Sequence, residues 1–323
     1  MSLNAGNKKK MNNWKLITPV ALIIFNRPDT TERVFAEIAK AKPLKLLLIG
    51  DGPRSNRAGD AEKVAATRAI VERVDWDCEV LTNFSEENMG CKERPKSGID
   101  WVFDQVEEAI ILEDDCLPHP TFFRFCQELL NQYRQDQRVS MISGNNFQPE
   151  YHNTDDSYYF SRYLGTWGWA SWRNRWQDSY DIDMQNWPVV RDSGWLEDIL
   201  GSKVEARKWT RTFESVYTGK INTAWDYQWL FAGWLHNRLG ITPRVNLISN
   251  IGFGADATHT TQSGSNLANR PTEEMTFPLN HPSYMIRNHM ADTMLFNHVY
   301  NFKPPWPQRI GNKLGRIVGA LKK

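Results

Sequence analysis

Apolar runs of strand length alternate with segments of helical periodicity over the first third of the chain. The runs begin roughly thirty residues apart, which is the size of a strand followed by a crossover helix. Their apolar and β-branched content predicts strands at residues 20–25, 45–50, 78–82 and 109–112. This regular alternation predicts an α/β fold with a mostly parallel central sheet, flanked by helices on both faces.

The segments between these runs carry apolar residues at helical spacing. Asp29 is predicted to cap the first helix, because Glu32 follows three residues later and an apolar face comes next. A second helix is predicted from about Asp60, a further helix at 120–135, and strands at 139–143 and 245–251. The helical positions predicted to face inward are Val34, Phe35, Ile38, Val64, Ile70, Val71, Val74, Ile99, Val102, Phe103 and Val106.

The fourth run ends abruptly in Glu113, Asp114 and Asp115. Three adjacent carboxylates repel one another and add nothing to a hydrophobic core, so folding alone would not place them at the tip of a buried strand. Carboxylate oxygens suit hard cations such as Mg²⁺ or Mn²⁺, which usually hold substrate phosphates as well. A solvated acidic turn is the other interpretation. The position of the triplet in the strand pattern favours a cation site.

Polar groups also follow the other predicted strands. Asn26 and Arg27 follow the first strand and Asp51 follows the second. Residues 88–91 follow the third, with Arg94 and Lys96 close behind. In sheets of this class, ligands bind outside the carboxyl ends of the strands, so these groups are expected around one crevice with the triplet. Turns are polar in general, which explains part of this pattern but not the adjacent carboxylates.

The second half of the chain is rich in aromatic residues, and the whole chain contains 14 tryptophans. Trp169, Trp172 and Trp176 fall at i, i+3 and i+7, a spacing that predicts a helix burying all three. Stacking of their indole faces on a sugar is the alternative. Trp167 follows Thr166 and precedes Gly168, in a glycine-bracketed segment suited to a bent backbone close to a ligand.

Asp226 lies within the aromatic run 223–229. Apolar rings around a carboxylate raise its proton affinity, which suits a general base near neutral pH. Asp226 could equally cap the helix that it opens. His259 follows a predicted strand and a glycine-containing bend, from where it could close over a metal bound elsewhere.

Size and composition fit a soluble enzyme. A formal net charge of +1 gives no electrostatic case for nucleic acid as the partner. The four cysteines have no CxxC spacing, so neither a zinc site nor a disulfide framework is expected, and reduced thiols fit a cytoplasmic protein. No apolar run reaches membrane-spanning length. Residues 1–15 are polar for the most part and are expected to be disordered.

The order of these features resembles the nucleotide-sugar glycosyltransferases of the GT-A fold. The resemblance rests on Asp51, Lys96, the acidic triplet, Asp226 and His259, in that order along roughly residues 18 to 260. The Glu-Asp-Asp form of the triplet is similar to that of N-acetylglucosaminyltransferase I and its bacterial relatives. The resemblance implies a Rossmann-like GT-A domain, with residues 16–150 as its nucleotide-sugar-binding half and residues 151–292 as its aromatic-rich acceptor-binding half.

The same resemblance implies roles on the donor side. Asp51 would accept a hydrogen bond from the nucleotide base, with Asn26 and Arg27 beside it, and Lys96 would contact the nucleotide or its phosphates. Glu113 and Asp114 would hold the ribose or the donor sugar.

Metal binding and catalysis are assigned in the same way. Asp115 would bind Mn²⁺ or Mg²⁺ directly, and His259 would help to grip the metal or the pyrophosphate. Asp226 would deprotonate the acceptor hydroxyl, so that the sugar is transferred with inversion. The expected donor is a UDP-sugar, and Trp167 is expected beside it. The expected acceptor is a glycan or lipid-linked molecule of bacterial polysaccharide biosynthesis.

Two other classes of protein remain open. A sugar nucleotidyltransferase would also use strand-end acids and a metal, but Asn26, Arg27 and Pro28 stand where a glycine-rich triphosphate loop is needed. A non-catalytic carbohydrate-binding protein would explain the tryptophans without needing the acidic triplet.

The tail at residues 293–323 is predicted to be helical and basic in its last part. Its apolar residues can share one helical face, with lysines and arginines around them. Such a helix could lie on anionic lipid at the inner face of the cytoplasmic membrane, or dock on the body of the protein.

Overall fold

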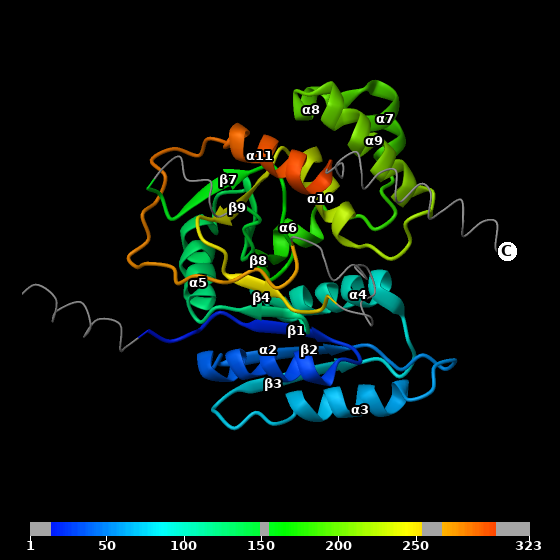
Figure 1. Cartoon of the computed structure of the whole chain (residues 1–323), viewed down its shortest axis with the longest axis vertical. Coiled ribbons are helices and arrows are strands. Elements are labelled where there is room, and N and C mark those ends of the chain that lie inside the picture. Colours follow the sequence, from blue (N-terminus) through cyan, green and yellow to red (C-terminus); the bar gives the residue numbers. More distant parts are fainter. Residues whose placement is uncertain (1–13, 149–154, 254–266, 302–323) are drawn as a thin grey trace, which may run out of the picture.

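An eight-stranded sheet in the order β3-β2-β1-β4-β8-β6-β9-β7 runs through the residues that the computed structural model describes, 14–148, 155–253 and 267–301 (Figure 1). A separate two-stranded sheet pairs β10 with β5 in antiparallel fashion. The strands are β1 (Val20–Ile24), β2 (Lys45–Gly50), β3 (Glu79–Phe84), β4 (Glu108–Glu113), β5 (Cys116–Pro118), β6 (Val139–Ser143), β7 (Tyr158–Ser161), β8 (Trp169–Trp172), β9 (Leu239–Pro243) and β10 (Ile248–Asn250).

The α/β class predicted from the alternating pattern is confirmed. Strands β3, β2, β1 and β4 are parallel to one another. Beyond β4 the sheet is mixed, because β8 runs antiparallel to both of its neighbours and β7 runs antiparallel to β9. The first four strands fall where the apolar runs predicted them, within two residues at either end.

Helices cover both faces of this sheet. The helices of the described residues are α2 (Pro28–Ala41), α3 (Asp60–Val71), α4 (Gly90–Gln105), α5 (Thr121–Tyr133), α6 (Arg173–Gln177), α7 (Trp187–Ser193), α8 (Trp195–Leu200), α9 (Lys203–Tyr217), α10 (Asp226–Leu235), α11 (His289–Leu295) and the π-helix η2 (Phe296–Tyr300), of which α7, α8 and α9 project away from the sheet. Alternate residues of β1 point to opposite faces, so Leu22 packs with α2 and α5, and Ile23 packs with α4 and α10. Two buried faces explain why the parallel strands are apolar throughout.

Helix α4 lies unusually close to the sheet at Gly98. A Cβ atom at this position would come within 2.5 Å of Ile49 Cγ2 on β2. The close approach fixes the direction of α4, whose first residues Gly90 and Cys91 therefore reach the carboxyl edge of the sheet.

The predicted cap of the first helix is wrong. Helix α2 begins at Pro28, its N-cap position is Arg27, and no side-chain hydrogen bond caps it. Proline at the first helical position fixes φ and needs no N–H partner, so the helix starts one residue before Asp29. Asp29 lies in the first turn instead.

The helix predicted from the tryptophan spacing is also wrong, although the predicted burial is right. Trp169 and Trp172 are the ends of strand β8, and only Trp176 is helical, in α6. A spacing of three residues in a strand sends two side chains to opposite faces, so Trp169 joins one core and Trp172 the other. A sheet buried on both faces accommodates both.

Among the described residues, no helix is long and apolar enough to cross a membrane. The described residues begin at 14 and end at 301. Residues 1–13 of the start predicted to be disordered, and most of the predicted basic tail, therefore lie outside them.

Trp169 should be a major contributor to stability, because it is 1% exposed and packs against Trp176, Trp225 and Trp229. We predict that Trp169→Ala lowers the free energy of unfolding by about 3–5 kcal/mol. The half-exposed Trp195 is the matched control. Trp195→Ala should change the free energy of unfolding by less than about 0.5 kcal/mol. Urea denaturation measures both, and equal losses would contradict the assignment of Trp169 to the core.

Candidate functional site

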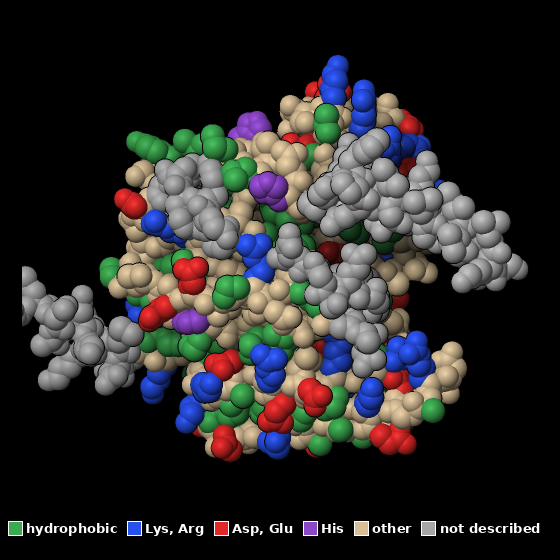
Figure 2. Space-filling view, viewed as in Figure 1, with side chains coloured by type: hydrophobic (Ala, Val, Ile, Leu, Met, Phe, Trp, Pro, Cys, Tyr) green, Lys and Arg blue, Asp and Glu red, His purple; other side chains and the backbone are tan. Residues whose placement is uncertain are grey.

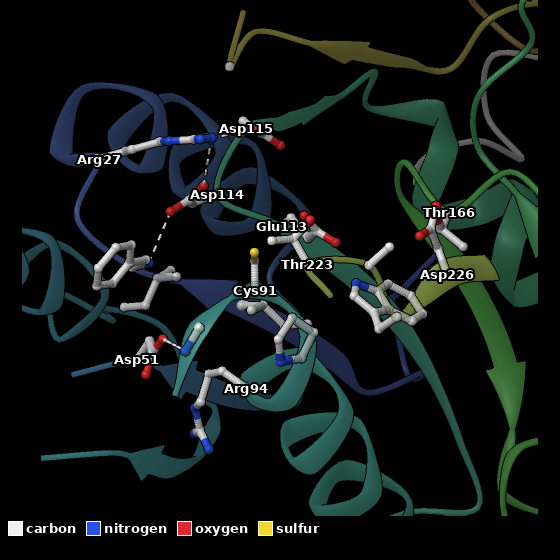
Figure 3. Close-up of a pocket in the computed structure, with 18 of the residues that line it drawn as sticks. Arg27, Asp51, Cys91, Arg94, Glu113, Asp114, Asp115, Thr166, Thr223 and Asp226 are labelled. Carbon is white, nitrogen blue, oxygen red and sulfur yellow. Dashed lines mark hydrogen bonds and ion pairs between the residues drawn. The ribbon is translucent and has the colours of Figure 1, made fainter. Parts of the chain in front are cut away.

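A cavity of about 670 Å³ opens at the carboxyl edge of the parallel strands (Figure 3). Its walls come from the ends of β1, β2 and β4, the start of α4, the segment before β8 and the start of α10. Strand β1 aligns Ile23 with Glu113 of β4, and Ile24 with Gly50 of β2, so the three strands end level with one another. The parallel register therefore brings their polar extensions to one place, as the strand pattern predicts.

All three acidic residues that end β4 line this cavity. Asp114 Oδ2 accepts a hydrogen bond of 3.0 Å from the backbone N–H of Phe25. Arg27 Nη1 donates to Asp115 Oδ2 at 2.6 Å and lies 3.7 Å from Asp114 Oδ1. The end of β1 thus supplies the one cationic side chain that pairs with the triplet in the described part of the chain.

The triplet is electrostatically unfavourable as it stands. Loss of solvent raises the pKa of Glu113 well above its usual range, and the carboxylates of Asp115 and Asp114 raise it further. Burial likewise raises the pKa of Asp114, although Arg27 opposes the shift. Burial opposes the charge of Arg27 itself, but the adjacent Asp114 and Asp115 outweigh that effect and raise its pKa. One guanidinium therefore offsets only part of the repulsion, and a further cation would relieve the rest.

Asp115 has room for such a cation. Its Oδ2 is held by Arg27. Among the described residues, Oδ1 makes only long contacts, 3.5 Å from Cys116 Sγ and 3.4 Å from Asn250 Nδ2. Gly252 makes space for this carboxylate, because a Cβ atom there would lie 2.1 Å from Asp115 Oδ2. The β10 segment therefore packs closely against the Asp115 side chain at the end of β4.

These residues fit a hard divalent ion that is shared with a ligand. Within the described ranges no three histidine, cysteine or carboxylate side chains converge to hold a metal by themselves. Mg²⁺ is usually bound through one or two carboxylates together with substrate phosphates, so one available oxygen of Asp115 is enough. His259, the other predicted metal ligand, lies outside the described residues.

Asp226 reaches the same cavity from its other side. It is the first residue of α10, and Thr166 lies near it in Figure 3. The N-cap position belongs to Trp225, and no side-chain hydrogen bond caps the helix there. Both Asp226 and Glu113 line the cavity, and the charge of Asp226 adds to the effects that raise the pKa of Glu113.

Trp167 lines the cavity and is only partly buried, and its predicted contact with the donor stays a prediction. Its ring packs edge-on against Phe147 at 5.0 Å and Phe253 at 5.7 Å between centroids. Trp169, Trp172 and Trp176 are buried instead, which leaves them no face for a sugar.

Asp51 lines the cavity, but its carboxylate is already occupied. Oδ1 accepts hydrogen bonds from the N–H groups of Gly52 and Met89, and Oδ2 accepts from Gly90 N–H and Asn88 Nδ2, all at 2.8–3.0 Å. The carboxylate thus accepts four hydrogen bonds, one at each of its four lone-pair positions. In this structure Asp51 anchors the loop before α4, and its predicted contact with a base stays a prediction.

Two residues predicted to contact the ligand lie outside the cavity. Lys96 pairs with Asp100 at 2.7 Å on the surface of α4, and Asn26 donates to Asp60 at 2.5 Å. Neither lines the cavity. Lys96 follows Arg94 by two residues, or about 200° around a helix, so only one of them can face inward.

Arg94 and Cys91 line the cavity in place of Lys96. They lie one turn apart in the first part of α4, at the edge of the sheet where the strand pattern predicted them. The guanidinium of Arg94 points away from Glu113 and donates to Asn83 Oδ1 at 2.7 Å (Figure 3). Arg94 therefore ties α4 to β3 beneath the cavity.

The comparisons with known proteins leave the function to be argued from this geometry. No protein-family model matches the chain, and no curated protein matches its sequence. Among solved structures it is similar to UDP-glucose pyrophosphorylase in complex with UDP-glucose, with 11% identity and a TM-score of 0.23. The match covers 45% of this chain and 62% of that one, less than two thirds of its length. A TM-score this low does not support transfer of that protein's function.

The four hydrogen bonds to Asp51 predict a structural role that can be measured. Asp51→Asn would place an amide group against backbone N–H donors, so we expect the free energy of unfolding to fall by about 2–3 kcal/mol. The exposed Asp75 gives the matched control, and Asp75→Asn should be neutral in the same urea titration. If Asp51→Asn were as stable as the parent, the anchoring role would be wrong and a pure ligand-binding role would be favoured.

Proposed function

We propose that the protein is an inverting, metal-dependent glycosyltransferase that uses a nucleoside diphosphate sugar, a UDP-sugar by the resemblance described above. The observation that carries the proposal is the convergence of the three strand-end carboxylates, Arg27 and Asp226 on one cavity. A cluster that folding alone would disfavour is explained if a cation and an anionic donor bind there.

The donor side of the proposed site is the left part of the cavity in Figure 3. Asp115 would hold the metal, and the metal would stabilise the charge that builds on the departing diphosphate. Arg27 is close enough to Asp115 to contact the same phosphates. Glu113 and Asp114 would then face the ribose or the sugar, and Asp51 would hold the loop 88–90 that borders the nucleotide.

The acceptor side would be the region around Asp226. A carboxylate across the cavity from the metal site is on the correct side to take a proton from an acceptor hydroxyl as it attacks. Thr166, Thr223 and Trp167 line the cavity around it and would shape the acceptor pocket. Attack from the face opposite the departing diphosphate inverts the anomeric carbon.

The two other classes of protein are supported less well. A carbohydrate-binding protein would not need the acidic triplet, and Trp169, Trp172 and Trp176 are in the core and not available to a sugar. A sugar nucleotidyltransferase needs a loop that cradles a triphosphate after β1, and here helix α2 starts at Pro28 directly after Arg27. Release of pyrophosphate from UTP and glucose 1-phosphate would nevertheless identify that activity.

Asp226 should be essential for turnover and dispensable for donor binding. We expect Asp226→Asn to lower UDP release from UDP-sugars by at least about 100-fold, as for loss of a general base, and to leave UDP binding with Mn²⁺ unchanged. Water serves as the acceptor in this assay, with UDP-glucose, UDP-galactose and UDP-N-acetylglucosamine as donors.

The control for Asp226 is another acid in the first turn of a helix. Asp198 occupies that place in α8 and is exposed, so Asp198→Asn should keep full turnover. If Asp226→Asn kept full turnover too, the base assignment would be wrong. If it lost both UDP binding and stability, the role of Asp226 would be structural.

A further inference from the structure

Helices α7, α8 and α9 form a lobe that stands out from the sheet at the top of Figure 1. A groove of about 460 Å³ opens between them, separate in its lining residues from the cavity described above. Val190, Leu196 and Ala206 line it and are buried, so its floor is apolar.

The rim of this groove is strongly basic. Lys203, Arg207 and Arg211 line it from one stripe of α9, at positions i, i+4 and i+8. Like charges at this spacing destabilise a helix, so helix stability does not explain them. Glu197 is the single carboxylate among the lining residues and lies 3.7 Å from Lys203.

Arg207 and Arg211 differ from most arginines of the protein. Their guanidinium groups make no ion pair or hydrogen bond within the described part of the chain. On the opposite wall, Arg191 already pairs with Asp192 at 2.8 Å and with Glu214 at 3.1 Å. The groove therefore offers two uncompensated positive charges above an apolar floor.

Large apolar side chains surround the groove on the surface of the lobe. Val189, Trp195 and Val204 are 58%, 48% and 59% exposed, and each is the chain neighbour of a groove-lining residue. In the space-filling view, lysine and arginine side chains lie at the tip of the lobe together with acidic ones and a hydrophobic side chain (Figure 2). A tryptophan beside cations on a projecting helical surface is the composition that binds a bilayer interface.

We propose that the α7–α9 lobe docks on an anionic lipid bilayer, with a lipid phosphate in the groove between Arg207 and Arg211. The exposed apolar residues Val189, Trp195 and Val204 would then enter the interface beside the headgroups. The charge of the rim is complementary to an anionic leaflet, and the apolar floor accommodates the glycerol and upper acyl carbons. This docking does not depend on the proposed sugar transfer.

Vesicle flotation of the full chain tests the charge component. The parent should bind vesicles of phosphatidylcholine with phosphatidylglycerol and should not bind phosphatidylcholine alone. Each cation near an anionic surface strengthens binding about fivefold, so the double variant Arg207→Gln/Arg211→Gln should bind about twenty-five-fold more weakly. The matched control is Arg33→Gln/Arg57→Gln, two exposed arginines of the first half, which should bind like the parent.

Unchanged binding by the Arg207→Gln/Arg211→Gln variant, or no binding by the parent, would overturn the proposal. Melting temperatures should match the parent, because neither guanidinium has a partner among the described residues.

A second variant distinguishes binding to a bilayer from binding of a soluble anion. Trp195→Ala should weaken vesicle binding and leave binding of inorganic phosphate, measured by calorimetry, unchanged. If Trp195→Ala left vesicle binding intact while Arg207→Gln/Arg211→Gln abolished phosphate binding, the groove would be a site for soluble anions and the bilayer assignment would fail.

Discussion

Repulsion among Glu113, Asp114 and Asp115 is the constraint on which the site depends. The parallel register of β1 and β4 fixes their backbone at the edge of the sheet, and burial denies them full hydration. Arg27 compensates only part of this charge. The pKa values of Glu113 and Asp114 are raised as a result, and a bound cation would favour their ionised forms. Carboxyl groups perturbed in this way cluster at functional sites.

The rest of the fold keeps this arrangement in place. Asp51 fixes the loop before α4, Arg94 ties α4 to β3, and Gly98 lets α4 lie close on β2. On the other side, the ring cluster of Trp169, Trp176 and Trp229 supports α10, whose first residue is Asp226. The aromatic core therefore positions the proposed base while the strand ends position the proposed metal ligand.

The sequence predicted the parallel part of the sheet well. The alternation of buried strands and amphipathic helices can be read locally, and it determines that the strands pair in parallel. Apolar runs located β1, β2, β4 and β6, and the strand ends brought the acids together as expected. Short apolar runs do not distinguish a helix from a strand, which is why the tryptophans of β8 were predicted to be helical.

Side-chain directions within the site could not be read from the sequence. The resemblance placed Lys96 at the ligand, but the start of α4, and so the direction in which Lys96 points, is not visible in the sequence. Sequence likewise cannot tell whether a carboxylate such as Asp51 faces a ligand or backbone amides. The role of His259 is untested, because it lies outside the described residues.

Calorimetric titration of UDP, with and without Mn²⁺, tests most directly whether the triplet exists to hold a metal and a diphosphate. The account predicts that UDP binds the parent tightly only with Mn²⁺, and that Asp115→Asn abolishes this dependence. Asp104→Asn, at an exposed position on α4, should bind like the parent. Equal UDP binding with and without the metal in the parent, or an Asp115→Asn variant that binds like the parent, would contradict the account.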